Sequence, residues 1–271
     1  MISVVVCAKD EAERIGACLS AVLDCVDVGE LIVVIGGDSD CPTAQAAREA
    51  VAESSVRRVI ICSTLGTLAQ DRQLGADLAE GDWIAYIDAD HLLQPGDLTS
   101  LVHDAREMSA DVVQSRLRIR PDSFWNRAES SFLDMTHITG VRDMVGVAPA
   151  VFRREVLQVV RFGATSGGGD DTDYMYRLHR DTDFRTAIGR TTITQVHAPR
   201  WRDYVAKWRW YGAGDGQFMA AHPERAASMR HHLLIRYPLL YPFKALLSGH
   251  WLAAPYAVAQ GLTRYMASRH G

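Results

Sequence analysis

The stretch Ile84-Ala85-Tyr86-Ile87-Asp88-Ala89-Asp90 joins an apolar strand pattern to two carboxylates, and it decides the fold. Residues 83–87 carry no charge, which is typical of a strand buried on both faces of a parallel sheet. Side chains at positions i and i+2 of an extended segment point the same way, so Asp88 and Asp90 are predicted to converge. Open α/β sheets bind ligands at this end of their strands. Carboxylate oxygens suit Mg²⁺ or Mn²⁺, so the pair indicates a divalent-cation site; a helix cap at Asp90 is the structural alternative.

Short apolar runs alternate with helical patterns through the first hundred residues. Runs rich in Val and Ile predict strands at 2–6, 31–35, 59–62 and 83–87. Apolar residues at helical spacing predict helices at 11–23, 42–52, 67–78 and 96–108. Repeated strand–helix units specify an α/β fold, with a Rossmann-like, doubly wound and mainly parallel sheet.

The second hundred residues continue with mixed elements and a glycine-rich segment. Strands are predicted at 112–119, 145–151 and 191–196, and helices at 153–160, 171–180 and 200–221. Gly167, Gly168 and Gly169 run directly into Asp170 and Asp171, which indicates a flexible loop that delivers acids to a helix N-terminus. Helix capping is the alternative role of these acids.

Charge is unevenly distributed, although the net charge is only −4. From Arg200 onward there are ten Lys/Arg and three Asp/Glu, whereas residues 1–199 hold nineteen basic and thirty acidic residues. A basic C-terminal segment on an acidic body indicates an anionic partner for that segment. The chain has no RNA- or DNA-binding motif, so we predict no nucleic-acid partner.

Residues 233–265 are rich in Leu, Ala, Tyr and Trp, but prolines and charges interrupt them before 18 uncharged residues accumulate. This pattern predicts amphipathic helices that lie at a membrane surface, or that cover the sheet or a homodimer contact. The five cysteines form no C-x-x-C pair, which predicts reduced thiols. We therefore expect a cytoplasmic protein, located in the cytosol or at the inner face of the cell membrane.

Five signatures occur in a fixed order along the chain. They are Val4-Val5-Val6-Cys7-Ala8-Lys9-Asp10-Glu11, Asp71-Arg72-Gln73-Leu74-Gly75, Asp88-Ala89-Asp90, Gly169-Asp170-Asp171-Thr172-Asp173 and Trp208-Arg209-Trp210-Tyr211-Gly212-Ala213-Gly214. With them the sequence resembles the family 2 glycosyltransferases over roughly residues 2–220. The resemblance implies the GT-A fold. The chain departs from the family pattern at Gly36-Gly37-Asp38-Ser39-Asp40, where members usually carry Asp-Asp-Gly-Ser, and at Gln73, where they carry Asn.

The resemblance implies a metal-dependent, inverting glycosyltransferase that moves a sugar from a UDP- or GDP-linked donor to an acceptor hydroxyl. Asp90 and His197 would hold Mn²⁺ or Mg²⁺, which stabilises the departing diphosphate. Asp171 matches the position of the general base, which deprotonates the acceptor. Donor-binding residues would be Ala8, Asp10, Glu11, Asp38, Arg72, Asp88 and Ala89. Acceptor-binding residues would be Gly168, Gly169, Asp170 and Trp208, and the acceptor a lipid phosphate, a glycan or a small molecule.

Three functional regions are predicted: a nucleotide-sugar-binding half (1–110), an acceptor-binding and catalytic half (111–222) and a helical extension that contacts a membrane or a partner subunit (223–271). A nucleotidyltransferase that forms sugar nucleotides is the alternative enzyme. That class usually carries a glycine-rich, basic loop after its first strand, where this chain has Cys7-Ala8-Lys9-Asp10-Glu11. A non-catalytic sugar-nucleotide-binding scaffold is the other alternative, and the intact Asp88, Asp90 and Asp171 argue against it.

Overall fold

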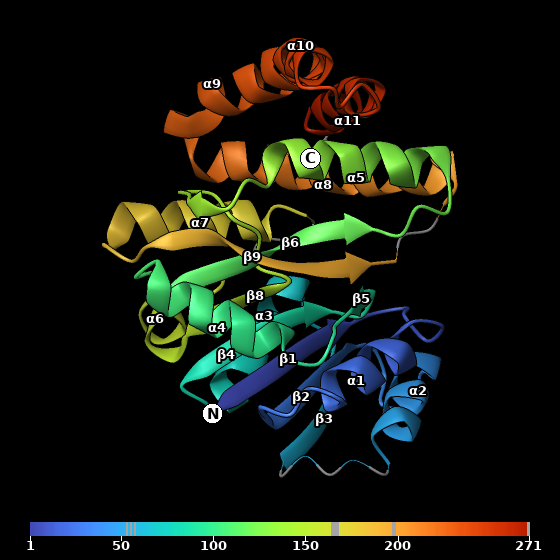
Figure 1. The fold of residues 1–271 in the computed structure, drawn as a ribbon, viewed down its shortest axis with the longest axis vertical. Helices are drawn as coiled ribbons and strands as arrows, with labels where there is room; N and C mark the ends of the chain where they lie inside the picture. The colour runs from blue at the N-terminus through green and yellow to red at the C-terminus, as the bar shows by residue number, and fades with distance from the viewer. Residues whose placement is uncertain (53, 55, 57, 164–167, 197–198, 270–271) are drawn as a thin grey trace. The chain divides into compact units, whose positions relative to one another are not determined.

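The computed structural model describes residues 1–271 apart from 53, 55, 57, 164–167, 197–198 and 270–271 (Figure 1). The chain forms two compact units. The first comprises Met1–Arg116, Thr139–Ala164 and Tyr174–Gln195, and the second comprises Leu117–Ile138, Thr165–Asp173 and Val196–Gly271. Each unit therefore combines segments that are distant in sequence. The functional boundaries expected at residues 110 and 222 stay a prediction.

Four parallel strands form the first half of the sheet, in the order β3-β2-β1-β4. Their bounds are β1 (Ile2–Ala8), β2 (Val28–Gly36), β3 (Arg58–Thr64) and β4 (Trp83–Asp88). All four predicted strands are confirmed. Cys7 pairs with both Val34 and Asp88, so the carboxyl ends of these strands lie along one edge of the sheet.

The second half of the sheet is mixed. Beyond β4 the order continues through β8 (Ala150–Arg153), β6 (Val112–Ile119), β9 (Thr186–Gln195) and β5 (His91–Leu92), and β7 (Gly140–Val141) pairs with β9. β8 is antiparallel to both β4 and β6, and β5 and β7 are antiparallel to β9. The strand predicted at 145–151 begins only after Pro149, which lacks the N–H that a ladder needs. The strand predicted at 191–196 starts earlier, because its pairing with β7 extends it past the polar Arg190.

Helices cover both faces of this sheet. Along β1, Val4 and Val6 belong to one apolar cluster and Val5 and Cys7 to the other. The first cluster includes α1 (Ile15–Leu23), α2 (Pro42–Val51) and α4 (Asp97–Glu107), and the second includes α3 (Leu68–Leu78), α6 (Arg154–Val159) and the part of α7 (Asp170–Asp181) after residue 173. Alternate side chains are thus buried on opposite faces, which confirms the predicted doubly wound α/β fold.

The second unit is helical. It contains α5 (Phe124–Thr136), α8 (Trp201–Ala221), α9 (Pro223–His231), the π-helix η1 (His232–Leu240), α10 (Tyr241–Leu247) and α11 (Ala253–Ala267). Its core is aromatic and contains Phe132, Tyr204, Trp208, Tyr237 and Tyr256. No helix in the described ranges combines the length and the hydropathy that a bilayer span requires.

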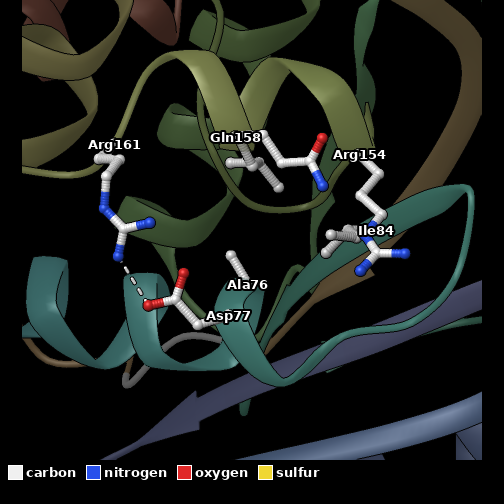
Figure 2. Close-up of a pocket in the computed structure, with 7 residues that line it drawn as sticks. Ala76, Asp77, Ile84, Arg154, Gln158 and Arg161 are labelled. Carbon is white, nitrogen blue, oxygen red and sulfur yellow. Dashed lines mark hydrogen bonds and ion pairs between the residues drawn. The ribbon is translucent and has the colours of Figure 1, made fainter.

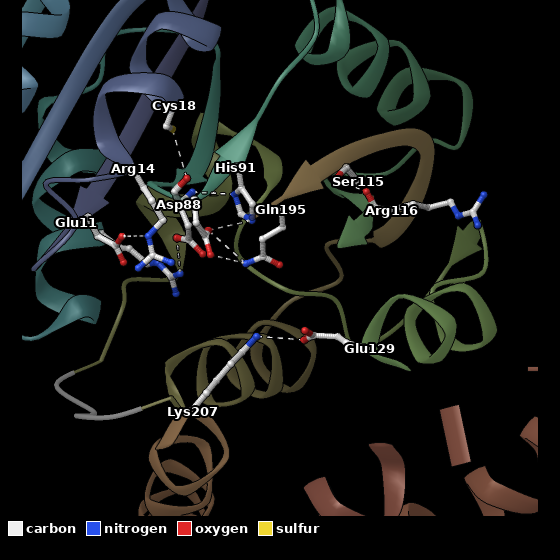
Figure 3. A network of polar contacts seen from close by, with 12 residues as sticks. Glu11, Arg14, Cys18, Asp88, His91, Ser115, Arg116, Glu129, Gln195 and Lys207 are labelled. Carbon is white, nitrogen blue, oxygen red and sulfur yellow. Dashed lines mark hydrogen bonds and ion pairs between the residues drawn. The ribbon is translucent and has the colours of Figure 1, made fainter. Parts of the chain in front are cut away.

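Buried ion pairs tie the helices of the second unit together. The Arg264 guanidinium donates to both carboxylate oxygens of Asp215, at 2.8 and 2.7 Å. Glu129 accepts from the hydroxyls of Tyr204 and Tyr256 at 2.8 and 3.0 Å, and its other contact, with Lys207 at 3.1 Å, is drawn in Figure 3. A charged group that is buried needs such partners, because desolvation otherwise disfavours the folded state.

The Asp215–Arg264 pair generates a stability prediction. Asp215 is 1% exposed, so Asp215→Ala would leave a buried guanidinium without its carboxylate and should cost about 3–5 kcal/mol of unfolding free energy. Urea denaturation measures this loss. The matched control is Asp122→Ala, which breaks the exposed pair with Arg120 and should change stability by no more than about 1 kcal/mol. Equal effects of the two substitutions would contradict this account.

Candidate active site

Two carboxylates and an imidazole gather where β4 ends. Single ligand atoms of Asp88, Asp90 and His91 lie within 4.8 Å of one another. Asp88 is the last residue of β4, whereas Asp90 lies in the turn that leads into β5. The predicted convergence of Asp88 and Asp90 is therefore observed. It arises because Asp90 lies in a turn, and not because the two side chains alternate along an extended strand. A helix cap is excluded for Asp90, because β5 follows it.

His91 is a member of this cluster that the sequence analysis missed. Its Nδ1 accepts the backbone N–H of Asp88 at 3.0 Å, and its Nε2 lies 3.8 Å from Oδ1 of Asp90 (Figure 3). A neutral imidazole that accepts at Nδ1 carries its proton on Nε2, which then faces the Asp90 carboxylate. The Nδ1 contact thus fixes the imidazole beside the backbone of Asp88 and near the Asp90 carboxylate. Its position directly after the Asp-Ala-Asp triplet was the available signal.

Gln195 is the second residue that sequence reasoning missed. Its Nε2 donates to Oδ1 and Oδ2 of Asp90 at 3.3 and 3.1 Å (Figure 3). The contact arises because β5 pairs with β9, where His91 is opposite Gln195. We predicted His197 as the residue from this segment that reaches the site. His197 lies outside the described residues.

Arg72 lies beside the acids, as its motif predicted. The side chain is buried, and Nη2 lies 3.4 Å from Oδ1 of Asp88. Two features hold the start of α3 in place. Thr67 and Gln70 form a reciprocal cap at its first turn, and the hydroxyl of Tyr86 donates to the carbonyl of Arg72 at 2.9 Å.

The remaining predicted donor-binding residues follow strands of the parallel half. Ala8 ends β1, and Asp10 and Asp38 lie exposed in the turns after β1 and β2. Asp10 adopts the left-handed conformation with φ of 57°, which a short polar side chain tolerates. The helix predicted from residue 11 begins only at Ile15, because residues 11–14 form a turn. Ala89, by contrast, is buried in the apolar core.

Negative charge is concentrated in this site. Burial raises the pKa of Glu11, and the charges of Asp90 and Asp88 raise it further, whereas its ion pair with Arg14 at 2.6 Å lowers it (Figure 3). The pKa of the Cys18 thiol is also raised, first by burial and then by the same two acids and Glu11. A hard divalent cation would compensate these charges with oxygen ligands. The residues present therefore fit Mg²⁺ or Mn²⁺.

The glycine-rich segment belongs to the second unit, where it packs tightly on α8. A Cβ built on Gly169 would lie 2.7 Å from the carbonyl oxygen of Gly214, and one built on Gly168 would lie 2.3 Å from the ring of Tyr211. The glycines that are described thus permit a close approach between two backbones. Gly168 and Gly169 lead directly into the acids of a helix N-terminus, as predicted. The flexibility of this loop stays a prediction, and Gly167 lies outside the described residues.

The acids after these glycines occupy the first turn of α7. Asp170 is buried, Asp171 is partly exposed, and Asp173 pairs with Nε2 of His222 at 2.8 Å. Asp171 lies near Tyr211, whose phenol pKa is raised mainly by burial and in part by this carboxylate. A helix N-terminus is a favourable place for acidic side chains, and this turn holds three of them.

Trp208 is not available to an acceptor. It is 0% exposed and lies in the aromatic core, with its ring centroid 5.5 Å from that of Tyr204 and 5.4 Å from that of Tyr256. The sequence pattern of α8 does not distinguish core aromatics from exposed ones, and only packing does so. On the same helix, Trp201 and Trp210 are exposed.

A cavity of about 120 Å³ lies in the first unit between α3 and α6 (Figure 2). It is lined by Ala76, Asp77, Ile84, Arg154, Leu157, Gln158 and Arg161. Asp77 and Arg161 form an ion pair at 2.7 Å on its wall. Ile84 lies near the start of β4 and Asp88 at its end, so this cavity is not part of the acidic cluster.

The solved structures most useful for comparison are glycosyltransferases. Mannosyltransferase PcManGT from Pyrobaculum calidifontis, in complex with GDP-Man and Mn²⁺, is 16% identical, with a TM-score of 0.68 over 99% of this chain and 86% of that chain. S. aureus TarS 1-349 in complex with UDP-GlcNAc is 12% identical, with a TM-score of 0.58 over 96% and 90%. Glucosyl-3-phosphoglycerate synthase from Mycobacterium tuberculosis is 17% identical, with a TM-score of 0.57 over 81% and 79%.

These likenesses identify the fold as that of the GT-A glycosyltransferases. No protein with a curated description matches the chain. The sequence model of glycosyl transferase family 2 matches residues 3–161, a range that includes Arg72, Asp88 and Asp90. Because that match covers more than half of the chain, this protein belongs to glycosyl transferase family 2.

Proposed function

We propose that this protein transfers a sugar from a nucleotide diphosphate sugar to an acceptor hydroxyl, with inversion at the anomeric carbon. The cluster of Asp88, Asp90 and His91 carries the proposal, because it gathers two carboxylates and an imidazole at the carboxyl edge of the sheet in a family 2 chain. Two of the similar structures hold a nucleotide sugar, one linked to GDP and the other to UDP. Both bases are therefore candidates for this chain.

Asp90 is the proposed ligand of Mg²⁺ or Mn²⁺, and Asp88 shares the cation through water or binds the ribose. The cation, when bound, supplies positive charge that stabilises the departing diphosphate. Gln195 holds the Asp90 carboxylate in place for it through hydrogen bonds, and His91 lies 3.8 Å from the same carboxylate. Arg72 adds a fixed positive charge on the donor side, 3.4 Å from Asp88. His197 is proposed as a second ligand.

Residues at the ends of β1 and β2 complete the proposed donor site. Ala8, Asp10 and Glu11 would line it from the first strand, Asp38 from the second, and Ala89 through its backbone between the two acids. On this proposal residues 1–110 bind the nucleotide sugar. Residues 111–222 supply the catalytic and acceptor-binding groups.

Asp171 is the proposed general base. Its position in the first turn of α7 leaves the carboxylate partly exposed, and such a group can accept a proton from a hydroxyl. Asp170, Gly168 and Gly169 would border the acceptor, which is a lipid phosphate, a glycan or a small molecule. When a single base assists the direct attack of the acceptor hydroxyl on the anomeric carbon, the configuration at that carbon is inverted.

Asp90→Ala should lower turnover at least about a hundredfold, because one of the two carboxylates that face the cation is lost. Release of nucleoside diphosphate from UDP- and GDP-sugars in Mn²⁺ measures turnover. The rise in Tm that Mn²⁺ and UDP or GDP give together should disappear as well. Asp77→Ala is the control, since Asp77 pairs with Arg161 outside the cluster. Pyrophosphate release from a nucleoside triphosphate would instead indicate a nucleotidyltransferase.

Asp171→Asn should reduce kcat at least about a hundredfold while the Mn²⁺-dependent binding of nucleoside diphosphate is retained. The substitution keeps the shape of the side chain and removes its basicity. Asp183→Asn, at an exposed position after the same helix, is the control and should leave kcat unchanged. A variant at Asp171 with the wild-type kcat would remove this residue from the mechanism.

Gln195→Ala should weaken the apparent affinity for Mn²⁺ about tenfold, because Asp90 loses the amide that orients it. Titration of activity with Mn²⁺ at saturating donor gives this constant. Gln94→Ala removes an exposed amide of the same unit and should leave the constant as it is. An unchanged constant for Gln195→Ala would show that the amide contributes nothing to the cation site.

A further inference from the structure

The segment formed by η1 and α10 is apolar on two opposite sides. Leu233, Tyr237 and Ala245 are buried in the aromatic core of the second unit. The opposite side carries exposed side chains at the spacing of one helix face. Together with the following Trp251 they form what we term the outer apolar surface: Leu239, Leu240, Phe243, Leu246, Leu247 and Trp251.

An exposed apolar surface of this kind is expected to contact a binding partner. Helices that are apolar all round are normally buried, and contiguous exposed apolar patches mark contacts with proteins or membranes. Leu246 is 65% and Leu247 74% exposed, so neither side chain contributes much to the core. No described helix could cross a bilayer.

The charge near this surface favours a membrane over a second copy of the chain as its binding partner. Residues 223–271 contain six Lys/Arg and a single acid, Glu224. Arg236 in η1 and Lys244 in α10 are exposed, as is Arg230 near the end of α9, and the Lys244 ammonium also donates to the carbonyl of Met135 at 3.1 Å. A symmetric self-contact would bring these cations together and would be disfavoured, whereas anionic lipid headgroups complement them. The exposed Trp251 suits the boundary between headgroups and acyl chains.

We propose that the outer apolar surface docks this protein on an anionic lipid bilayer, with the axis of α10 parallel to the membrane plane. Phe243, Leu246 and Leu247 would insert at the acyl boundary, and Arg236 would contact the headgroups. This inference adds a binding partner to the proposed function. It does not depend on the identity of the donor or of the acceptor.

Vesicle flotation tests the proposal, without donor or metal. The wild-type protein should float with phosphatidylcholine vesicles that contain about 30% phosphatidylglycerol, and far less with phosphatidylcholine alone. Raising the salt concentration to about 0.5 M should weaken binding. The double variant L246S/L247S should lower the bound fraction about tenfold. The matched control V26S/V159S removes two exposed valines of the first unit, 86% and 62% exposed, and should bind as the wild type does.

Two further measurements make the result decisive. Release of nucleoside diphosphate from the donor in vesicle-free solution should be equal in L246S/L247S and wild type, which separates docking from catalysis. Failure of the wild type to float with anionic vesicles would overturn the proposal. The proposal would also be overturned if light scattering showed that the wild type is a dimer, that L246S/L247S dissociates this dimer, and that vesicle binding is absent. Equal loss of binding in V26S/V159S would overturn it too.

Discussion

Two carboxylates held at the end of one buried strand repel each other, and the surrounding residues compensate that repulsion. Arg72 places a guanidinium 3.4 Å from Asp88, and the side-chain amide of Gln195, from another strand, donates to both carboxylate oxygens of Asp90. The interaction between unit charges strengthens as water is excluded, so a partly buried site binds a cation more firmly than an exposed one. The pairing of the strands in the sheet fixes the positions of these side chains. Without that register Asp88, Asp90 and His91 would not lie together.

Sequence patterns predicted the parallel half of the sheet, because each strand there is an unbroken apolar run between helical segments. They also predicted that Arg72 and Asp88 belong to one site. They could not find Gln195, since its contact with Asp90 joins residues 105 positions apart through a strand of two residues, β5. A strand so short has no periodicity to detect. His91 was missed for a related reason, because its role depends on a turn.

Gly169 and Trp208 show that residue type alone does not predict the role of a residue. Gly169 suggested freedom of movement, but its missing side chain admits Gly214 from α8. Trp208 suggested a platform for a sugar, but its neighbours enclose it completely. The type of a residue limits the contacts that it can make. Which of these contacts forms depends on the neighbouring residues. Both positions therefore required the packing of the second unit before their roles could be assigned.

The thiol of Cys18 lies directly against the acidic cluster. Its sulfur donates to the carbonyl of Asp88 at 3.4 Å, and its pKa is raised first by burial and then by Asp90 and Asp88. The sulfur is therefore engaged with the backbone of Asp88, whereas the side chains of Asp88 and Asp90 present carboxylate oxygen. On the proposed function, oxygen of this kind suits magnesium or manganese.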